Sequence, residues 1–178
     1  PGKYNLLNAA GAALACIVNE ISLDEIRIGL SSYKGVKRRF EIQFDNSKIT
    51  YIDDYAHHPN EIISLLSAVK EFYPDKKLIG IFQPHLFSRT QDFMEDFATE
   101  LSAADESYIL PIYPARELPI PGVASEMIIG KMTNKNVVLL QKEDLSAWVK
   151  TEAPKLLVMA GAGDIDVLIR NIKNDLTQ

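Results

Sequence analysis

The stretch Leu156-Leu-Val-Met-Ala160 is apolar at every position, and Gly161-Ala-Gly-Asp164 follows it directly. A second run of the same kind, Leu78-Ile-Gly-Ile-Phe82, lies earlier in the chain. Short runs without polar alternation are typical of strands that are covered on both faces, as in parallel sheets. The two runs therefore predict an α/β fold with a mostly parallel sheet flanked by helices.

Helical and strand patterns alternate outward from these two runs. Strands are expected at 40–44, 48–54, 77–83, 106–112, 137–140 and 156–160. Helices are expected at 59–72, 88–103, 125–132, 145–153 and 164–174. Strands that alternate with helices imply parallel pairing and right-handed crossovers. Either Ser88 or Thr90 is expected to cap the helix over 88–103, because hydroxyl side chains favour that position.

The first part of the chain has a different character. Residues 4–19 form an Ala- and Leu-rich helical pattern, and Ser22-Leu-Asp-Glu25 matches a capping box that begins a helix over about 23–31. No strand pattern accompanies these two helices, so a domain boundary is expected near residue 36. The chain begins Pro-Gly-Lys without a methionine, and Pro1 is therefore expected to be an internal position of a longer protein.

The composition supports a folded domain and argues against some classes of partner. Of the 178 residues, 47% are hydrophobic and 24% are charged, close to the averages for globular proteins. The net charge of −5 gives no electrostatic case for binding nucleic acid or an anionic membrane. Cys16 lies in an apolar run and is expected to be a buried structural thiol. A chain with one cysteine and no internal disulfide suits the reducing cytoplasm, where we expect it.

All three histidines fall in two segments that follow predicted strands. These segments are Asp53-Asp-Tyr-Ala-His-His58 and Pro84-His-Leu-Phe-Ser-Arg-Thr90. Ligands of open α/β sheets bind outside the carboxyl ends of the strands, so both segments are expected to contact a polar ligand. Successive strand side chains point to opposite faces, so Asp53 and Asp54 are not expected to work as a carboxylate pair.

Each of these features also has a structural interpretation. Asp53 could be a turn residue, and His58 could begin a helix. Arg89 could bind a carboxylate or phosphate near a helix start, or it could be a solvated side chain. Gly161-Ala-Gly-Asp164 is a weak phosphate signal, and Asp164 is favoured as a plain N-cap. A dedicated metal centre is not expected, because neighbouring side chains diverge and no His-x-His or His-x-x-x-His spacing exists.

The roles of two polar groups outside these segments remain open. Asn5 and Asn8 lie three residues apart on one helix face, where capping or interhelical hydrogen bonds explain them about as well as ligand contact. The basic run Lys37-Arg-Arg39 is either a solvated strip at the boundary or a contact to a bound anion.

Taken together, several strings resemble the Mur ligase family, and they occur here in the family's order. The strings are Gly2-Lys-Tyr-Asn-Leu-Leu-Asn-Ala9, Gly35-Val-Lys-Arg-Arg-Phe40, Asp53-Asp-Tyr-Ala-His-His-Pro59, Phe82-Gln-Pro-His85, Ser88-Arg-Thr90, Ile112-Tyr-Pro-Ala115 and Gly161-Ala-Gly-Asp-Ile165. The resemblance covers essentially the whole chain. The Phe-Gln-Pro-His and Ser-Arg-Thr pieces resemble the alanine-adding members more than the relative that recycles murein tripeptide. Folylpolyglutamate synthase is less similar.

The resemblance implies a domain organisation. Family members have an amino-terminal domain for the UDP-sugar, a central domain with the ATP phosphate loop, and a Rossmann-like carboxy-terminal domain. Residues 1–36 are thus expected to be the tail of the central domain, and residues 37–178 the carboxy-terminal domain. The family's phosphate loop, Gly-Thr-x-Gly-Lys-Ser/Thr, does not occur in this sequence. The chain is therefore expected to lack the amino-terminal and central domains and to be inactive alone.

The resemblance also implies an activity. The alanine-adding members that these strings resemble use ATP and Mg²⁺ to phosphorylate the carboxylate of UDP-N-acetylmuramate, and the amine of L-alanine then attacks the acyl phosphate. The product enters peptidoglycan synthesis, and the Mg²⁺ ligands are expected in the central domain. A stand-alone nucleotide- or amino-acid-binding module, the murein-tripeptide recycling ligase and a metal-dependent hydrolase remain alternatives.

Site residues follow from the resemblance position by position. Those implied to contact the nucleotide are Asn5, Asn8, Arg39 and Asp54. Those implied to line or border the amino-acid pocket are Tyr55, His57, His85, Arg89 and Asp164. The two histidines are expected to position substrate rather than to act as a base or a metal ligand, and no catalytic residue is expected in the chain.

Two positions depart from the family pattern. Tyr4 stands where the family commonly has His, so an aromatic contact to adenine is kept while its hydrogen bonds differ. Leu86 stands where the family often has Arg, so recognition of the alanine carboxylate is expected to depend more on Arg89.

Overall fold

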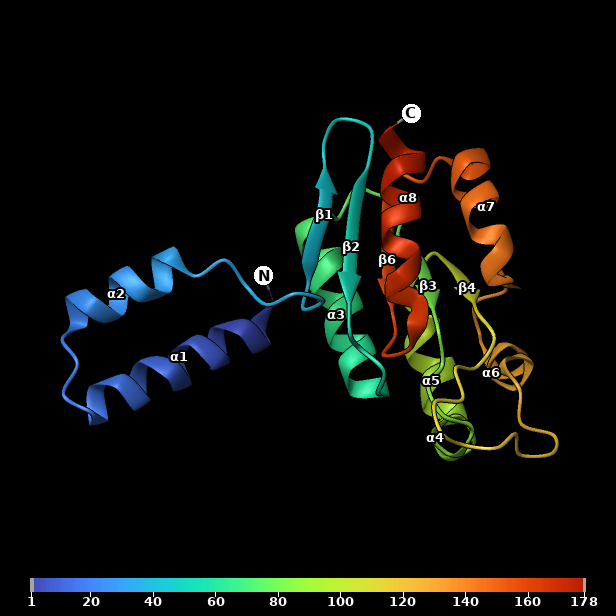
Figure 1. Cartoon of the computed structure of the whole chain (residues 1–178), viewed down its shortest axis with the longest axis horizontal. Coiled ribbons are helices and arrows are strands. Elements are labelled where there is room, and N and C mark those ends of the chain that lie inside the picture. The colour runs from blue at the N-terminus through green and yellow to red at the C-terminus, as the bar shows by residue number, and fades with distance from the viewer. Residues whose placement is uncertain (1, 178) are drawn as a thin grey trace.

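A six-stranded sheet forms the centre of the computed structural model, which describes residues 2–177 and the side chains of residues 2–169 and 171–174. The strands are β1 (Glu41–Asp45), β2 (Thr50–Asp54), β3 (Ile79–Phe82), β4 (Glu106–Ile109), β5 (Val137–Leu139) and β6 (Leu156–Ala160). Their order across the sheet is β1-β2-β6-β3-β4-β5 (Figure 1). Only β1 and β2 pair in antiparallel fashion, and all other neighbours are parallel. The predicted α/β class with a mostly parallel sheet is confirmed.

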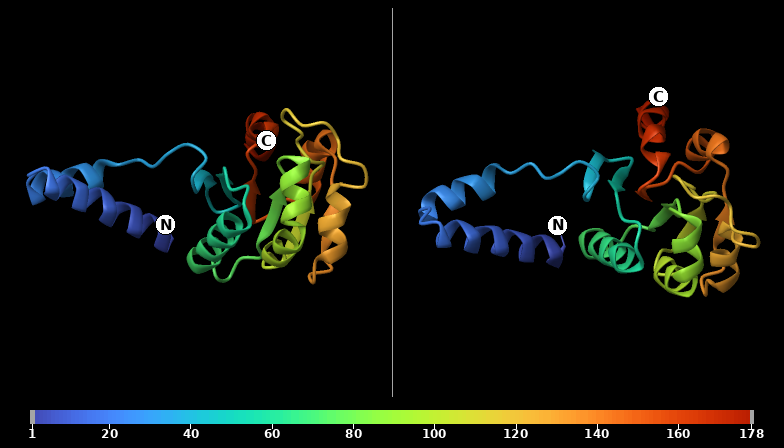
Figure 2. Two further views of the ribbon diagram at one scale, coloured as in Figure 1. Left: turned by 90° about the horizontal axis from the view of Figure 1, so that it is seen from below. Right: turned by 60° about the horizontal axis from the view of Figure 1, so that its bottom comes forward.

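Helices cover both faces of this sheet. Their bounds are α1 (Lys3–Val18), α2 (Leu23–Ser32), α3 (Pro59–Phe72), α4 (Phe87–Asp92), α5 (Met94–Leu101), α6 (Ser125–Lys131), α7 (Leu145–Glu152) and α8 (Val167–Thr177), with 3₁₀ turns η1 (Lys142–Asp144) and η2 (Asp164–Asp166). Helices α3, α5 and α6 pack on one face, and α7 and α8 on the other (Figure 2). The fold is thus a three-layer sandwich with the sheet in the middle.

The apolar strand β6 lies at the centre of the sheet, between β2 and β3. Its alternate residues Leu156 and Val158 join the core under α3 and α5, whereas Leu157 and Met159 join the core under α7 and α8. Every residue of β6 is buried, as predicted for a strand covered on both faces. Each such side chain contributes roughly 1.5–3 kcal/mol through burial, so this strand anchors both layers.

Helices α1 and α2 form an arm that extends away from the sheet (Figures 1 and 2). The predicted capping box is present, because the Ser22 side chain accepts the Glu25 N–H while Glu25 accepts the Ser22 N–H. No described side chain of α1 is buried, and Leu7 is 74% exposed. Cys16 is half-buried rather than buried, so that prediction is wrong, because the described residues do not cover this part of the arm. The domain division near residue 36 stays a prediction.

Several expected boundaries differ from the structure. The helix expected over 88–103 is two helices, α4 and α5, separated at Phe93. Strand β4 ends at Ile109 instead of 112, since Pro111 has no N–H for a ladder hydrogen bond. Strand β2 begins at 50 rather than 48, because the Asn46 side chain accepts the N–H groups of residues 48 and 49.

The expected cap of the helix after β3 is also wrong. Leu86 is the N-cap of α4, with φ 72°, and it provides no side-chain cap. The Ser88 hydroxyl donates to Glu117, and the Thr90 hydroxyl donates to the Leu86 carbonyl. The Thr90 hydroxyl therefore stabilises the turn between β3 and α4 from within, and the Ser88 hydroxyl ties this turn to the loop that carries Glu117.

None of the helices in residues 2–177 combines the length and apolar character that spanning a membrane requires.

Candidate functional site

The carboxyl ends of three neighbouring strands bring the two histidine segments together. Asp54 at the end of β2 and Phe82 at the end of β3 both pair with Ala160 at the end of β6. The segments that leave β2 and β3 therefore start on either side of β6. His57 and His85 meet there, with 6.0 Å between their ring centroids.

A row of four rings crosses this edge of the sheet. Tyr55 meets His57 edge-on at 5.2 Å between centroids, and His85 stacks on Tyr113 at 5.7 Å. The backbone holds the last pair, because Leu86 N–H donates to the Tyr113 carbonyl over 2.9 Å. The row thus runs from Tyr55 through His57 and His85 to Tyr113.

His58 does not belong to this row. Its ring packs on Phe93, with 4.8 Å between centroids, and its backbone forms the N-cap of α3 ahead of Pro59. The structural interpretation of His58 therefore holds. The neighbouring histidines diverge, as the strand geometry of this segment suggested.

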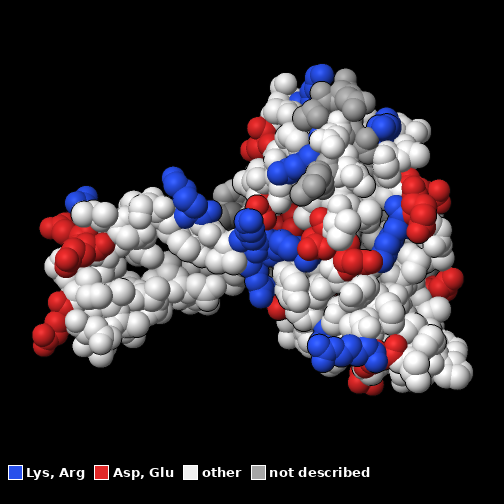
Figure 3. Space-filling model, viewed as in Figure 1, with Lys and Arg blue, Asp and Glu red and all other residues white. Residues whose placement is uncertain are grey.

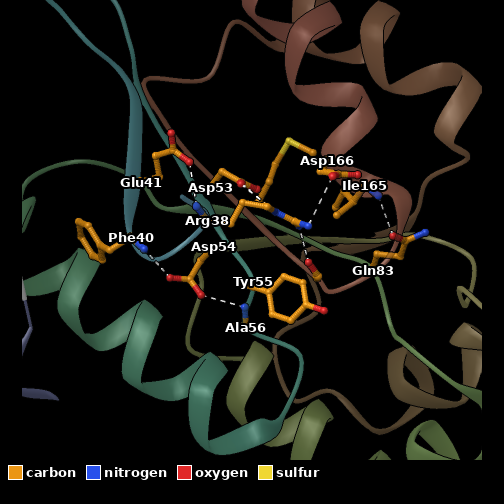
Figure 4. Close-up of polar contacts among 12 residues, drawn as sticks. Arg38, Phe40, Glu41, Asp53, Asp54, Tyr55, Ala56, Gln83, Ile165 and Asp166 are labelled. Atoms are coloured by element: carbon orange, nitrogen blue, oxygen red, sulfur yellow. Dashed lines mark hydrogen bonds and ion pairs between the residues drawn. The ribbon is translucent and has the colours of Figure 1, made fainter. Parts of the chain in front are cut away.

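Asp53 and Asp54 face opposite sides of β2, as alternation predicts (Figure 4). Each Asp54 oxygen accepts one backbone N–H, from Phe40 over 2.6 Å and from Ala56 over 2.8 Å. Burial raises the pKa of Asp54, and these two N–H groups oppose the rise. Asp54 is only 4% exposed and holds the linker before β1 against the loop after β2.

Asp53 forms a buried ion pair with Arg38, the middle residue of the basic run, and this internal pairing was not among the roles expected for the run. The Arg38 guanidinium also donates to the Gly161 carbonyl over 2.5 Å and lies 3.9 Å from Asp166 (Figure 4). Burial raises the pKa of Asp53 to about 6, although Arg38 acts against this shift. Nothing in the sequence pairs Asp53 with Arg38, and only the structure shows that the aspartate is fully buried and therefore requires a cation.

The predicted nucleotide residues gather where α1 meets the sheet domain. Burial and the charge of Asp54 raise the pKa of the Tyr4 hydroxyl, while Arg39 and a hydrogen bond to Asn5 act in the opposite direction. These four side chains therefore lie in one neighbourhood. Asn8 is exposed one helical turn further along α1.

Arg39 is the exposed cation of this neighbourhood. Its guanidinium lies 3.7 Å from the Glu61 carboxylate and 6.0 Å from the centre of the Tyr55 ring, and its side chain is 51% exposed. Figure 3 shows basic side chains gathered where the arm joins the sheet domain. An anionic ligand at this junction would meet a half-exposed guanidinium whose ion pair with Glu61 is long, at 3.7 Å.

Glu61 is a second site residue that the sequence analysis missed. It accepts the backbone N–H of His57 over 2.9 Å, and the same oxygen lies 3.3 Å from His57 Nδ1. Burial raises the pKa of Glu61, but the His57 N–H and the charges of His57 and Arg39 outweigh it and leave the pKa lowered. Its position as the third residue of α3 was the available signal, since such residues reach back past the helix start.

Two polar atoms on the second histidine segment are buried without a hydrogen-bond partner in the described structure. They are Nδ1 of His85 and Nη1 of Arg89. Burial lowers the pKa of His85, and the charges of Arg89 and His57 lower it further. A neutral imidazole and a guanidinium with unused hydrogen-bonding capacity thus lie on the same turn.

The glycine loop after β6 is locked onto the second histidine segment. The buried Gln83 side chain donates to Asp164 over 3.0 Å and accepts the Ile165 N–H over 3.1 Å. A Cβ on Gly163 would come within 2.6 Å of Gln83 and Tyr113, so the loop requires glycine there. Gln83 was not among the expected site residues, although it is part of the Phe-Gln-Pro-His string.

Asp164 borders the site but is not an N-cap. The 3₁₀ turn η2 is capped by Gly163, and Asp164 instead pairs with Gln83 and Lys142. Burial raises the pKa of Asp164, but Lys142 and Gln83 outweigh it and leave the pKa lowered. The N-cap interpretation is therefore wrong, because the side chain faces the second histidine segment and η1.

The proline-rich loop after β4 forms the outer side of the site. Glu117 accepts the Ser88 hydroxyl over 2.5 Å and the Ser88 N–H over 3.0 Å. These hydrogen bonds lower the pKa of Glu117. The loop thereby fixes the turn that carries His85 and Arg89.

The second histidine segment offers nitrogen atoms that suit anions and polar groups. Across the described residues there is no cluster of three or more His, Cys, Asp or Glu side chains that could hold a metal ion. Of the buried side-chain atoms without a partner in the described structure, the two on the second histidine segment are an imidazole and a guanidinium nitrogen, and the others are Asp53 Oδ1 and the Trp148 indole nitrogen. Imidazole and guanidinium donors suit carboxylates and phosphates.

Comparison with known proteins places this geometry in a family. The family model described as "Mur ligase, glutamate ligase domain" matches residues 38–168. The UDP-N-acetylmuramate–L-alanine ligase of Christiangramia forsetii is 49% identical over 176 residues, which are 99% of this chain and 39% of that protein. The enzyme of the same name from Flavobacterium johnsoniae is 45% identical over 178 residues, which are 100% of this chain and 40% of that protein.

Solved structures agree with this match. The crystal structure of the UDP-N-acetylmuramate–alanine ligase of Thermotoga maritima superposes with a TM-score of 0.82 and 28% identity, over 99% of this chain and 38% of that one. The chain thus spans about two fifths of the length of the relatives that it matches. The chain belongs to the Mur ligase family, and residues 38–168 form its glutamate ligase domain.

Proposed function

We propose that this chain is the carboxy-terminal part of a cytoplasmic, ATP-dependent ligase that joins L-alanine to UDP-N-acetylmuramate for peptidoglycan synthesis. The names of the relatives from Christiangramia forsetii and Flavobacterium johnsoniae support this activity. The strings Phe82-Gln-Pro-His85 and Ser88-Arg-Thr90 favour it over the murein-tripeptide recycling ligase. The chain's task is to hold the amino acid and one side of the nucleotide.

The observation that carries the proposal is the pair of buried, unpartnered nitrogens on His85 and Arg89. A buried polar atom without a partner costs free energy, and a ligand that completes its hydrogen bonds removes this cost. The carboxylate of L-alanine matches a guanidinium in both charge and shape. Arg89 thus binds the alanine carboxylate, and Tyr55, His57 and His85 line the pocket, which Asp164 borders.

The nucleotide side of the proposal depends on the junction between α1 and the sheet domain. Asn5 and Asn8 contact the adenine side of ATP, and Arg39 contacts its phosphates or ribose. Asp54 holds the linker that carries Arg39, and its remaining lone pairs accept from the ribose. This assignment is supported by the proximity of Tyr4, Arg39 and Asp54.

The chain's contribution to the reaction is positioning. Neutralising charge on the transferring phosphoryl group is the main demand of such chemistry, and Mg²⁺ supplies it when bound with ATP. The phosphate-loop motif that performs this work in the family does not occur in this sequence. We therefore expect the 178-residue chain alone to be inactive.

Product formation by the intact ligase tests the proposed function. The enzyme is supplied with ATP, Mg²⁺ and UDP-N-acetylmuramate, and either L-alanine or murein tripeptide. We expect amide product and ADP with L-alanine and much less with the tripeptide. Preference for the tripeptide would favour the recycling ligase instead, and no product with either would leave a binding module as the better account.

A further inference from the structure

The His57 ring is held from one side by a carbonyl and a carboxylate. Its Nδ1 lies 2.9 Å from the carbonyl oxygen of Tyr55 and 3.3 Å from Glu61 Oε2. A carbonyl oxygen can only accept, so Nδ1 carries the proton. The same Glu61 oxygen accepts the backbone N–H of His57, which fixes the carboxylate behind the ring.

This arrangement decides what the other ring nitrogen can do. A neutral imidazole with its proton on Nδ1 has a free lone pair on Nε2. Within the part of the chain that the structure describes, Nε2 has no hydrogen-bond partner, and the side chain is 22% exposed. The rings of Tyr55 and His85 lie on either side. Nε2 is therefore an available acceptor in the middle of the row of rings.

We propose that His57 Nε2 removes a proton from the ammonium group of the incoming amino acid, and that Glu61 is the positioning residue that orients the ring. This inference rests on the proposed function and gives His57 more than the positioning role expected from the sequence. An ammonium group has no lone pair, so the amino acid must lose this proton before its nitrogen can attack.

The ammonium transfers one proton to Nε2, which gives a neutral amine and an imidazolium beside the Glu61 carboxylate. The amine nitrogen forms a bond to the carbonyl carbon of the acyl phosphate, and the carbon–oxygen bond to phosphate breaks. Phosphate leaves with that electron pair, and the amide nitrogen gives its excess proton to phosphate or solvent.

The other titratable side chains of the site fit this role less well. Burial and the charge of Arg89 lower the pKa of His85, so His85 holds a proton weakly. Asp54 already accepts two backbone N–H groups, and Asp53 pairs with Arg38 on the other side of β2. His57 is the histidine with a carboxylate behind it, an arrangement that orients general bases in other enzymes.

The charged groups around His57 set the expected pH response. Glu61 on α3 lies 3.3 Å from Nδ1 and stabilises an imidazolium, whereas the neighbouring His85 opposes it when His85 is itself protonated. Arg39 acts through Glu61 from 3.7 Å. Glu61→Gln keeps an oxygen that accepts the His57 N–H but removes the charge. The acid limb of kcat/KM for L-alanine should therefore move to lower pH in this variant.

Hydroxylamine provides the most direct test, because it is largely unprotonated at neutral pH and traps acyl phosphates as hydroxamates. In the intact ligase, His57→Gln should lower kcat/KM for L-alanine by about 10²–10⁴-fold, the range for loss of a general base. Hydroxamate formation with hydroxylamine should fall far less. Both rates come from the same preparation, so partial unfolding cancels in their ratio.

His58→Gln is the matched control, since that ring packs on Phe93 outside the site. We expect its ratio of the two rates to equal that of the unmodified enzyme. An equal loss of both reactions in His57→Gln, or an unmoved acid limb in Glu61→Gln, would overturn the inference. An unmodified enzyme that forms amide but no hydroxamate would also overturn the inference, because the proposed step requires an acyl phosphate that a neutral amine can attack. An enzyme that forms neither product would refute the proposed ligase function itself.

Discussion

Arg38 and Asp53 form a buried ion pair, with 3.1 Å between Nε and Oδ2, across 15 positions of the chain. Arg38 belongs to the linker between the arm and the sheet, whereas Asp53 belongs to β2. The guanidinium also reaches the Gly161 carbonyl in the glycine loop. One side chain thus joins the linker, the second strand and the loop that borders the site.

The buried Asp53 should make stability depend on pH. Burial raises its pKa to about 6 in the folded chain, above the ordinary value of 3.8. The folded state then binds the Asp53 proton more tightly than the unfolded state does. The stability that this proton contributes is fully present below about pH 4 and is lost as pH rises through about 6. The full effect is on the order of 3 kcal/mol. Urea unfolding at pH 4.5 and 7 should show that the free energy of unfolding depends less on pH in Asp53→Asn than in the unmodified chain. An unchanged pH dependence would contradict the raised pKa of Asp53.

Removal of the cation should be costly at neutral pH. Arg38→Met leaves the Asp53 carboxylate buried and unpaired, and such losses cost about 3–5 kcal/mol. The exposed pair of Arg27 and Asp24, at 3.3 Å, provides a control, because Arg27→Met should cost no more than about 1 kcal/mol. Urea unfolding at pH 7 measures both. Equal losses of unfolding free energy in Arg38→Met and Arg27→Met would contradict the expected cost of leaving Asp53 buried without its cation.

The glycine loop should not tolerate a methyl group. Gly163→Ala places a Cβ 2.6 Å from Gln83 Oε1, so the loop must move. Overpacking of this kind costs about 1–3 kcal/mol. Gly130→Ala is the matched control, because nothing lies within 4 Å of its Cβ and alanine favours its helix by about 0.5–1 kcal/mol. Thermal unfolding should show a lower Tm for Gly163→Ala and no decrease in Tm for Gly130→Ala.

The contact between Ser88 and Glu117 should affect binding of the amino acid. In the intact ligase, Ser88→Ala and Glu117→Gln should each raise KM for L-alanine several-fold, because the turn that carries Arg89 loses its outer support. The double variant should be no worse than the single ones, since both remove one contact. Glu126→Gln, at an exposed position of α6, is the control. Additive effects would show that the two residues act separately.

The sequence predicted the centre of the sheet well because β3 and β6 are uniformly apolar. Leu156–Ala160 and Leu78–Phe82 have no polar alternation. This pattern indicates strands that are buried on both faces, and it can be recognised without knowledge of their tertiary contacts. The capping box at Ser22 was equally local. By contrast, the turn at Leu86, with its positive φ, contacts Tyr113 and Glu117, and Phe93, where the helix breaks, packs on His58; all three partners are far away in sequence.

The sequence predicted where the site lies, but not the hydrogen bonds and ion pairs within it. The histidine segments could be placed at strand ends, so their meeting at 6.0 Å follows from the topology. Arg38, Glu61 and Gln83 were missed, because their roles arise from partners on other elements. Adjacent Arg38 and Arg39 have the same chemistry, and only the structure separates the buried one from the half-exposed one.

The central claim is that this chain binds the amino acid through Arg89 on the second histidine segment. The most direct test is the steady-state kinetics of Arg89→Ala in the intact ligase, with L-alanine and ATP varied in turn. We predict that KM for L-alanine rises far more than KM for ATP, because the lost guanidinium binds the alanine carboxylate. Equal increases in both KM values would contradict the claim.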